Sequence, residues 1–135
     1  ITRGTKKGHI ARATLEGIAF QNFDLLTSMQ KDLGIPLKKL RVDGGAAANS
    51  LLMQFQSDIL GVPLERPSYL ETTSLGAIFA AGLGAGVWTS VEAIERNGKI
   101  NRKFFPSMST QEREERLRGW KQAVRQTTAH LVTMT

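Results

Sequence analysis

The sequence predicts an α/β fold in which a small sheet is covered on its faces by helices. Two observations support this prediction. Segments with apolar residues at helical spacing alternate with short apolar segments bounded by Gly or Pro, which is the order of elements in an α/β domain. Only two or three of the short segments are clear, so the sheet is small. With 135 residues, the chain forms one domain at most.

A long helix is predicted first, over residues 7–32. Its apolar residues recur at helical spacing from Ile10 to Met29, with no proline and few β-branched residues among them. Gly34 and Pro36 follow, and both residue types are typical of the end of a helix. The helix is therefore expected to end near residue 32.

Two short strands flank the second helix. Residues 37–42 form a short apolar segment between a proline and a glycine, which suits a strand. Residues 46–60 return to the helical period, and Gly61 is the expected C-terminal cap. Residues 62–66 are the second strand, which we expect near a sheet edge because Pro63 has no N–H to donate.

Two more helices follow the second strand. The segment 71–86, "ETTSLGAIFAAGLGAG", is rich in small residues and suits a helix capped by Thr72 or Thr73. A short helix begins at Thr89, because Thr89 and Glu92 have the spacing of a capping box. The "GLGAG" within the first segment follows a helix rather than a strand, so we interpret it as a helix exit and not as a phosphate loop.

The last predicted helix is amphipathic. Ser109 and Glu112 repeat the capping-box spacing and open a helix that extends to about His130. Residues 97–108 before it are expected to be an irregular connection, attached to the domain by its two phenylalanines. The apolar side of this helix consists of Leu117, Trp120, Val124 and Leu131.

Composition restricts the classes of function. The chain has no cysteine, which excludes disulfides and thiolate metal sites and is compatible with a cytoplasmic protein. A net charge of +6 raises the question of nucleic acid, but the 18 basic residues are spread along the chain and interleaved with acids. We therefore expect no nucleic-acid binding. The longest uncharged run holds too many Thr, Ser and Gly residues to span a membrane, and no carboxylates have metal-ligand spacing.

The decapeptide "RVDGGAAANS", residues 41–50, is the candidate site. A strand that passes through Asp-Gly-Gly into a helix brings free backbone amides and the positive end of a helix dipole together. Gly44 and Gly45 leave room for a ligand, and Asn49 follows Gly45 by one helical turn. The same residues also suit a tight turn without a ligand, and the motif is neither a Walker loop nor a GxGxxG fingerprint. Both interpretations stay open at this point.

The two histidines do not indicate catalysis. His9 lies in the first turn of the first helix and His130 near the end of the last one. No Ser, Cys or carboxylate arrangement marks either of them as a base.

Three consecutive segments carry a resemblance to a known family. They are "TRGTKKGHIARATLEGIAFQ", "LRVDGGAAANSLLMQFQSDILGVPLERP" and "ETTSLGAIFAAGLGAGVW". In this order they resemble the C-terminal domain of the FGGY family of carbohydrate kinases, and within it the members that phosphorylate glycerol. The resemblance covers nearly the whole chain and weakens after about Val91. It implies an actin-like, ribonuclease H-like ATPase fold, of which residues 1–135 are the ATP-binding C-terminal domain, truncated at its N-terminus and without the substrate domain.

The resemblance also implies particular site residues. The turn at Asp43 to Ala46 is similar to the adenosine-binding loop of the family, so the residues expected at the nucleotide are Gly44, Gly45, Ala46 and Asn49. Gly45 would lie against the nucleotide and Asn49 would meet its adenine or ribose side. His9 and Glu16 match signature positions that organise the first helix.

The reaction that the resemblance implies is transfer of the γ-phosphoryl group of Mg-ATP to a terminal hydroxyl of glycerol. The family's catalytic aspartate, polyol ligands and phosphate loops have no counterpart in this chain, so we expect no catalytic residue and no Mg²⁺ ligand here. ATP or ADP is the expected ligand, and glycerol would bind through the missing domain. Open alternatives are a kinase for another sugar or polyol such as xylulose, a non-catalytic nucleotide-binding module and, from charge alone, a nucleic-acid-binding domain. The resemblance also leaves a homo-oligomer open.

Overall fold

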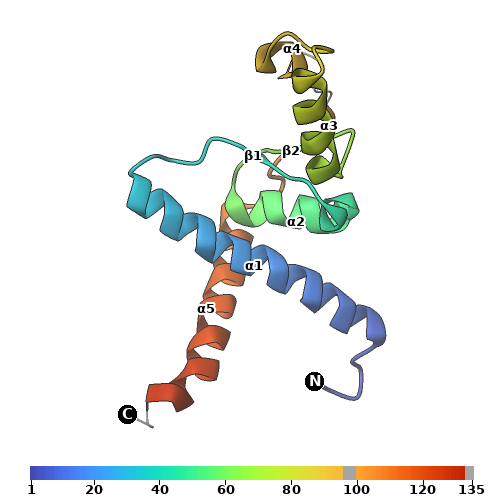
Figure 1. The fold of residues 1–135 in the computed structure, drawn as a ribbon. Helices are drawn as coiled ribbons and strands as arrows, with labels where there is room; N and C mark the ends of the chain where they lie inside the picture. The colour runs from blue at the N-terminus through green and yellow to red at the C-terminus, as the bar shows by residue number, and fades with distance from the viewer. Residues whose placement is uncertain (96–99, 133–135) are drawn as a thin grey trace.

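A three-stranded sheet and five α-helices form the described part of the chain, residues 1–95 and 100–132, in the computed structural model (Figure 1). The predicted α/β class and the helix-rich, small-sheet architecture are confirmed. The elements in chain order are α1 (Lys7–Leu33), β1 (Leu40–Arg41), the 3₁₀ helix η1 (Gly45–Ala48), α2 (Ser50–Leu60), β2 (Leu64–Pro67), α3 (Thr72–Gly84), α4 (Val91–Glu95), β3 (Ile100–Phe104) and α5 (Thr110–Val132).

The sheet has the strand order β1-β2-β3, with β1 parallel and β3 antiparallel to β2. The strand that contains Leu64 is therefore central, and its predicted place at an edge is wrong. Pro63 precedes the first paired residue and contributes only its carbonyl, which accepts a hydrogen bond from Leu40 N at 3.0 Å. The missing N–H of Pro63 therefore removes no hydrogen bond from the ladder.

The strand β3 lies within the segment 97–108 that was expected to be irregular. That expectation is wrong for residues 100–104. Residues 97–99 lie outside the described residues. The strand "INRKF" has little apolar alternation of its own, and it is held by pairing with β2, in which Phe104 is opposite Leu64. Such long-range pairing overrides local sequence preference.

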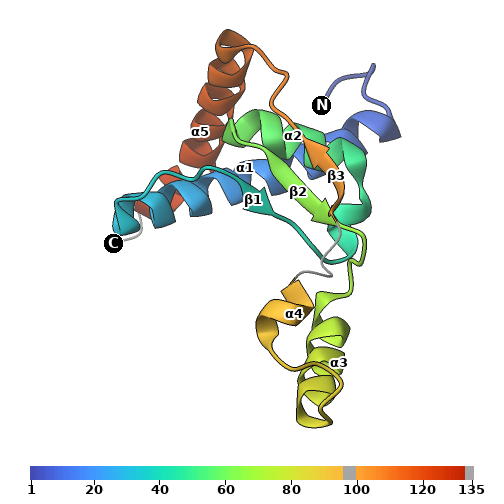
Figure 2. The same cartoon turned by 90° about the horizontal axis from the view of Figure 1, so that it is seen from above.

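The two faces of the sheet differ in chemistry. Leu64 and Phe104 lie on one face, are almost completely buried and pack beside α2. Helices α1 and α5 contact α2 in turn, so the helical cover expected for the sheet is present on this face (Figure 2). The register places Arg41, Glu65 and Lys103 side by side on the opposite face.

Glu65 on the charged face is 6% exposed and is surrounded by cations. Its carboxylate lies 3.1 Å from Lys103 Nζ, 3.2 Å from Lys39 Nζ and 3.7 Å from Arg41 Nε. Hydrogen bonds from Lys103 and Lys39 lower the pKa of Glu65 from its ordinary value of 4.5, and burial opposes this shift. The folded protein therefore favours the ionised carboxylate.

This lowered pKa predicts an acid-dependent loss of stability. In the unfolded chain Glu65 takes up a proton near pH 4.5, whereas the folded protein resists protonation until lower pH, so stability falls as the pH drops below that value. Glu65→Gln is expected to lower the urea midpoint at pH 7 and to flatten its decline below pH 4.5. Glu114→Gln, which removes an exposed carboxylate on α5, is the control. Equal acid profiles for the two variants would contradict this role of Glu65.

The hydrophobic core is formed where α1, α2 and α5 meet. The Phe20 ring packs edge-on against Phe55 of α2, with the centroids 5.5 Å apart, and stacks on Trp120 of α5 at 5.3 Å. The indole Nε1 of Trp120 donates to Asp24 Oδ2 at 2.6 Å. The buried core residues are Ala19, Phe20, Ala47, Leu52, Met53, Phe55, Ile59, Leu64, Phe104 and Leu117.

Helix α1 confirms the first predicted element. Gly34 caps it with φ 65°, in the left-handed region that favours glycine. Its 27 residues span about 40 Å, against about 16 Å for the 11 residues of α2. Both ends of α1 therefore extend beyond its partner (Figure 1). As a result, several apolar side chains of α1 are exposed, namely Ile10, Ile18, Leu25 and Met29.

The helix caps were predicted less well than the helices. Thr72 does not cap α3, because its hydroxyl donates to Asp43 instead. The short helix α4 is capped by Ser90, whose Oγ accepts from Ala93 N at 3.3 Å, and not by Thr89. Ser109 caps α5 as predicted, with Oγ accepting from Glu112 N at 3.2 Å.

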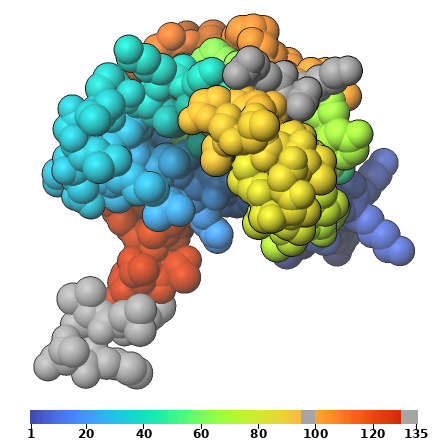
Figure 3. All heavy atoms as spheres, turned by 45° about the horizontal axis from the view of Figure 1, so that its top comes forward, coloured from blue at the N-terminus to red at the C-terminus, as the bar shows by residue number. Residues whose placement is uncertain are grey.

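The carboxyl-terminal part of α5 extends away from the rest of the molecule (Figure 3). The side chains of His130 and Leu131 lie outside the described residues. None of the helices in the described ranges combines the length and the apolar composition that crossing a membrane requires.

Gly82 of α3 is required by the packing of Trp88. A Cβ atom at Gly82 would overlap the Trp88 ring, whereas one at Gly76 of the same helix would meet nothing within 4 Å. Gly82→Ala is therefore expected to destabilise the protein by about 1–3 kcal/mol, as overpacking does. Gly76→Ala is expected to stabilise it by roughly 0.5–1 kcal/mol through helix propensity. Thermal unfolding of both variants checks this, and a shift of the same sign in both would refute it.

Candidate functional site

The four residues predicted to form the site lie in one turn, at the carboxyl end of β1. Gly44 has φ 79° and ψ 174°, a combination that is essentially restricted to glycine. Its N–H donates to Leu70 O at 2.9 Å. Gly45, Ala46 and Asn49 follow within η1 and at its end. The structure therefore brings the four predicted residues together, in a conformation that needs at least one of the two glycines.

The helix predicted over residues 46–60 does not begin at Ala46. The 3₁₀ helix η1 comes first, Asn49 is extended at φ −77° and ψ 102°, and α2 starts at Ser50. Asn49 Oδ1 accepts hydrogen bonds from Leu51 N at 3.0 Å and Leu52 N at 3.1 Å. Asn is among the strongest N-cap residues, so it interrupts the helical run here. The sequence interpretation missed this capping role of Asn49.

The turn offers hydrogen-bond donors to a ligand. Gly45 and Ala46 are the first two residues of η1, and their N–H groups have no acceptor among the described residues. The Nδ2 group of exposed Asn49 has no partner in the described part of the chain either, because the capping bonds use only Oδ1. A Cβ atom at Gly45 would meet nothing within 4 Å. The turn thus presents open space beside three donors, a chemistry that suits a nucleotide.

Two contacts hold the turn against the start of α3. Thr72 Oγ1 donates to Asp43 Oδ2 at 2.7 Å, and the Gly44–Leu70 hydrogen bond lies beside it. In Figure 2, β1 and β2 point in the same direction and α3 begins beyond their carboxyl ends. This is the edge at which open α/β sheets bind their ligands.

Arg66 of β2 supports the turn from the sheet side. Its Nη1 donates to Ala47 O at 3.0 Å and to Ala48 O at 3.1 Å. The sequence interpretation treated Arg66 only as the end of a strand. The signal that could have found it is the alternation of β2, which places Arg66 on the same face as Leu64 and hence toward α2.

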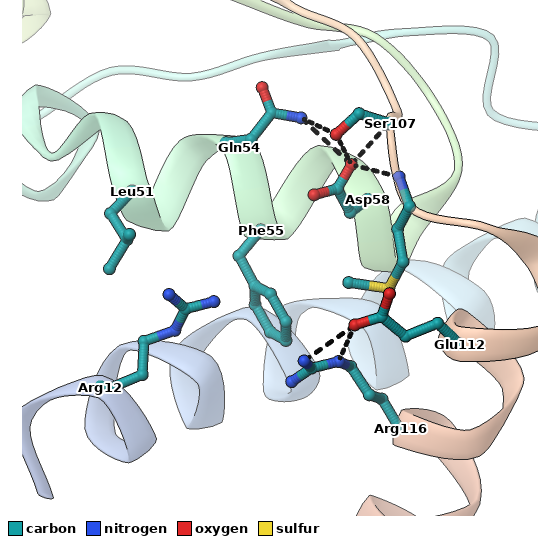
Figure 4. Close-up of a pocket in the computed structure, with 9 residues that line it drawn as sticks. Arg12, Leu51, Gln54, Phe55, Asp58, Ser107, Glu112 and Arg116 are labelled. Carbon is teal, nitrogen blue, oxygen red and sulfur yellow. Dashed lines mark hydrogen bonds and ion pairs between the residues drawn. The ribbon is translucent and has the colours of Figure 1, made fainter. Parts of the chain in front are cut away.

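A separate hollow of about 300 Å³ lies between α1, α2 and α5 (Figure 4). Its charged groups are already paired: Arg12 with Glu16 at 2.6 Å, Arg116 with Glu112 at 2.9 Å, and Asp58 Oδ1 with four donors that include Ser107 N at 2.7 Å. Such mutual pairing is typical of a structural junction between helices. Its lining residues are Arg12, Leu51, Gln54, Phe55, Asp58, Ser107, Met108, Glu112 and Arg116.

The remaining polar residues of the sequence interpretation have structural contacts. His9 Nδ1 accepts from Lys6 N at 3.2 Å at the start of α1. Glu16 binds Arg12 on α1 and Arg116 of α5, the latter at 3.4 Å. Both residues organise α1, as expected. Within the described ranges, no three His, Asp or Glu side chains gather into a group that could hold a metal ion.

Comparison with known proteins identifies the family. Residues 1–85 match the C-terminal domain of the FGGY family of carbohydrate kinases. The chain belongs to this family.

Individual relatives narrow the comparison further. A glycerol kinase of Caldanaerobacter subterraneus subsp. tengcongensis is 58% identical over 124 residues, which are 92% of this chain and 25% of that protein. The crystal structure of Plasmodium falciparum glycerol kinase with ADP superposes with a TM-score of 0.81 at 39% identity, over 94% of this chain and 26% of the other. A xylulose kinase of Lactobacillus acidophilus, with a TM-score of 0.71 at 24% identity over 96% and 26% of the two chains, shares the fold. The chain spans about a quarter of the length of the curated relatives it matches.

Proposed function

We propose that this chain is the ATP-binding C-terminal domain of a glycerol kinase, within a longer protein whose other domain binds glycerol. The observation that supports this most is the glycine turn at residues 43–49, with its free amides and open space, in a chain of the FGGY kinase family. The identity of 58% to a protein named glycerol kinase favours glycerol as the substrate. A cytoplasmic location is part of this proposal.

The chain's own residues bind and orient the nucleotide in this proposal. Gly45 lies against the adenosine, Gly44 and Ala46 shape the turn, and Asn49 donates from Nδ2 to the adenine or ribose. Phosphoryl transfer depends on holding the two reactants in line and on neutralising charge. Fixing the adenosine end contributes to the first of these. The catalytic base and the ligands of Mg²⁺ would come from the rest of the protein.

Kinase activity of the full-length protein, encoded by the reading frame that contains these 135 residues, tests the proposal. ADP formation from Mg-ATP is measured with glycerol, xylulose and gluconate as separate acceptors. We expect the highest kcat/KM with glycerol. A higher kcat/KM with xylulose or gluconate would reject glycerol as the substrate and indicate another kinase of the family.

The non-catalytic alternative has a different outcome in the same experiment. ADP binding without ADP formation on any acceptor would favour a nucleotide-binding module. Absence of ADP binding would reject the proposal as a whole.

A further inference from the structure

We propose that Arg66 is a positioning residue for nucleotide binding, which fixes the glycine turn without touching the ligand. This inference rests on the proposed function of the turn. Arg66 lies on the central strand β2 and is partly buried. Its guanidinium reaches η1, 18 and 19 residues away in the sequence, and joins the turn to the sheet.

The turn needs support from outside because its own side chains can form few hydrogen bonds that would fix its conformation. Between Asn49 and Gly44 it consists of one glycine and three alanines, none of which has a polar side chain. Both glycines also have wide backbone freedom. Within η1 and its flanks, Gly44 O accepts from Ala47 N and Ala46 O from Asn49 N, each at 3.1 Å. Hydrogen bonds of the 3₁₀ type have poorer geometry than those of an α-helix, so they hold this short segment only weakly.

The Arg66 guanidinium supplies the missing partners. Nη1 binds the carbonyls of Ala47 and Ala48, at 3.0 and 3.1 Å, where η1 ends and its carbonyls lack further partners within the helix. These are charge-assisted hydrogen bonds, which are stronger than those between neutral groups. They orient the peptide units between Gly45 and Asn49, and so the donors on either side of them.

Arg66 is itself held in place by β3. Its guanidinium lies over the Phe104 ring at 5.4 Å from the centroid, and Nη2 donates to Asn101 Oδ1 at 3.4 Å. The turn is therefore connected to the central strand and, through it, to the neighbouring strand.

The stability of α2 alone does not explain this arginine. A cation near the first turn of a helix is disfavoured by the helix dipole, and Arg66 Nη1 lies 3.4 Å from Oγ of Ser50, the first residue of α2. The cap of α2 is already supplied by Asn49. The two carbonyls of η1 are the contacts that favour a guanidinium at this position.

Arg102 provides a matched control. Its guanidinium stacks on the same Phe104 ring, at 4.7 Å, and its Nη1 reaches the same Ser50 Oγ at 3.3 Å. No hydrogen bond joins Arg102 to the carbonyls of η1 among the described residues. Arg102→Met therefore removes similar packing and one similar polar contact, but leaves the turn attached.

The experiment compares Arg66→Met, Arg66→Lys and Arg102→Met in the full-length protein. It measures the thermal midpoint, hydrogen exchange of peptides that cover residues 44–50, and the Kd for ADP. We expect Arg66→Met to speed exchange in the turn and to raise the Kd about tenfold, because the donors are no longer preorganised. Arg102→Met is expected to change the Kd less than about twofold at a similar thermal midpoint. Arg66→Lys keeps the charge and one donor to the carbonyls, and is expected to fall between the two.

Several results would overturn the role of Arg66. One is a Kd for Arg66→Met equal to that of Arg102→Met, and another is turn exchange at the unmodified rate. If Arg66→Met does not fold, a Kd for Arg66→Lys equal to that of the unmodified protein overturns it. If Gly45→Val loses ADP binding and the Arg66 variants do not, the positioning role of Arg66 is rejected, while the proposed nucleotide site at the turn is retained. If the unmodified protein does not bind ADP, the proposed function fails, and the positioning role fails with it.

Discussion

Replacing Gly45 by Val is expected to weaken ADP binding to the full-length protein by at least about thirtyfold, or roughly 2 kcal/mol. A Cβ atom at Gly45 meets no protein atom within 4 Å, and the backbone there is not in the left-handed region. The fold therefore tolerates the substitution, while the side chain fills the space assigned to the nucleotide. Titration calorimetry with ADP measures the loss of affinity, and thermal unfolding measures the stability.

The control for this substitution is Gly119→Val. Gly119 is exposed on α5, and a Cβ atom added there would also meet nothing within 4 Å. The two variants share the chemical change and the open surroundings, but only Gly45 lies in the turn. Gly45→Ala adds a smaller group and is expected to give an intermediate loss. If Gly45→Val binds ADP as tightly as Gly119→Val, the nucleotide does not lie against Gly45.

Replacing Asn49 by Asp is expected to weaken ADP binding about tenfold without destabilising α2. The side chain of Asn49 has two separable roles in this proposal, since Oδ1 caps α2 and Nδ2, which has no partner among the described residues, would donate to the ligand. Asp caps helices as well as Asn does, but an ionised carboxylate has no donor. Affinity and stability therefore respond differently, which calorimetry and thermal unfolding together detect.

Two further variants separate charge and capping from recognition. Asn49→Ser retains a capping oxygen without the negative charge, and is expected to lose affinity as Asp does. Asn49→Ala removes the cap as well and is expected to cost about 1 kcal/mol of stability. If Asn49→Ser binds ADP with unchanged affinity, then Nδ2 has no role and Asn49 is a structural cap alone.

Local signals in the sequence were sufficient for most of the fold. The helical period and Gly34 defined α1, and Gly61, with φ 72°, ended α2 as predicted. The candidate turn could also be found, because a strand followed by two glycines is a local pattern. These features depend on residues within a few positions of one another.

Features that depend on distant residues could not be predicted in this way. The strand β3 exists because Phe104 pairs with Leu64, and nothing in residues 100–104 indicates a strand by itself. Local sequence makes Thr72 a candidate cap. In the structure its hydroxyl instead donates a hydrogen bond to Asp43, which lies 29 residues earlier in the sequence. For Arg66, the alternation of β2 indicates the face on which it lies, but residue type does not reveal its acceptors, which are backbone carbonyls of alanines.

Helix α2 connects the candidate site to the opposite end of the domain. Seven of its eleven residues are buried, Asn49 caps one end, and at the other end Asp58 Oδ1 accepts from Ser107 N at 2.7 Å while Arg113 donates to Ile59 O at 2.7 Å. A packed helix of this length behaves as a stiff rod of about 16 Å. The turn and the beginning of α5 therefore contact the two ends of the same stiff element.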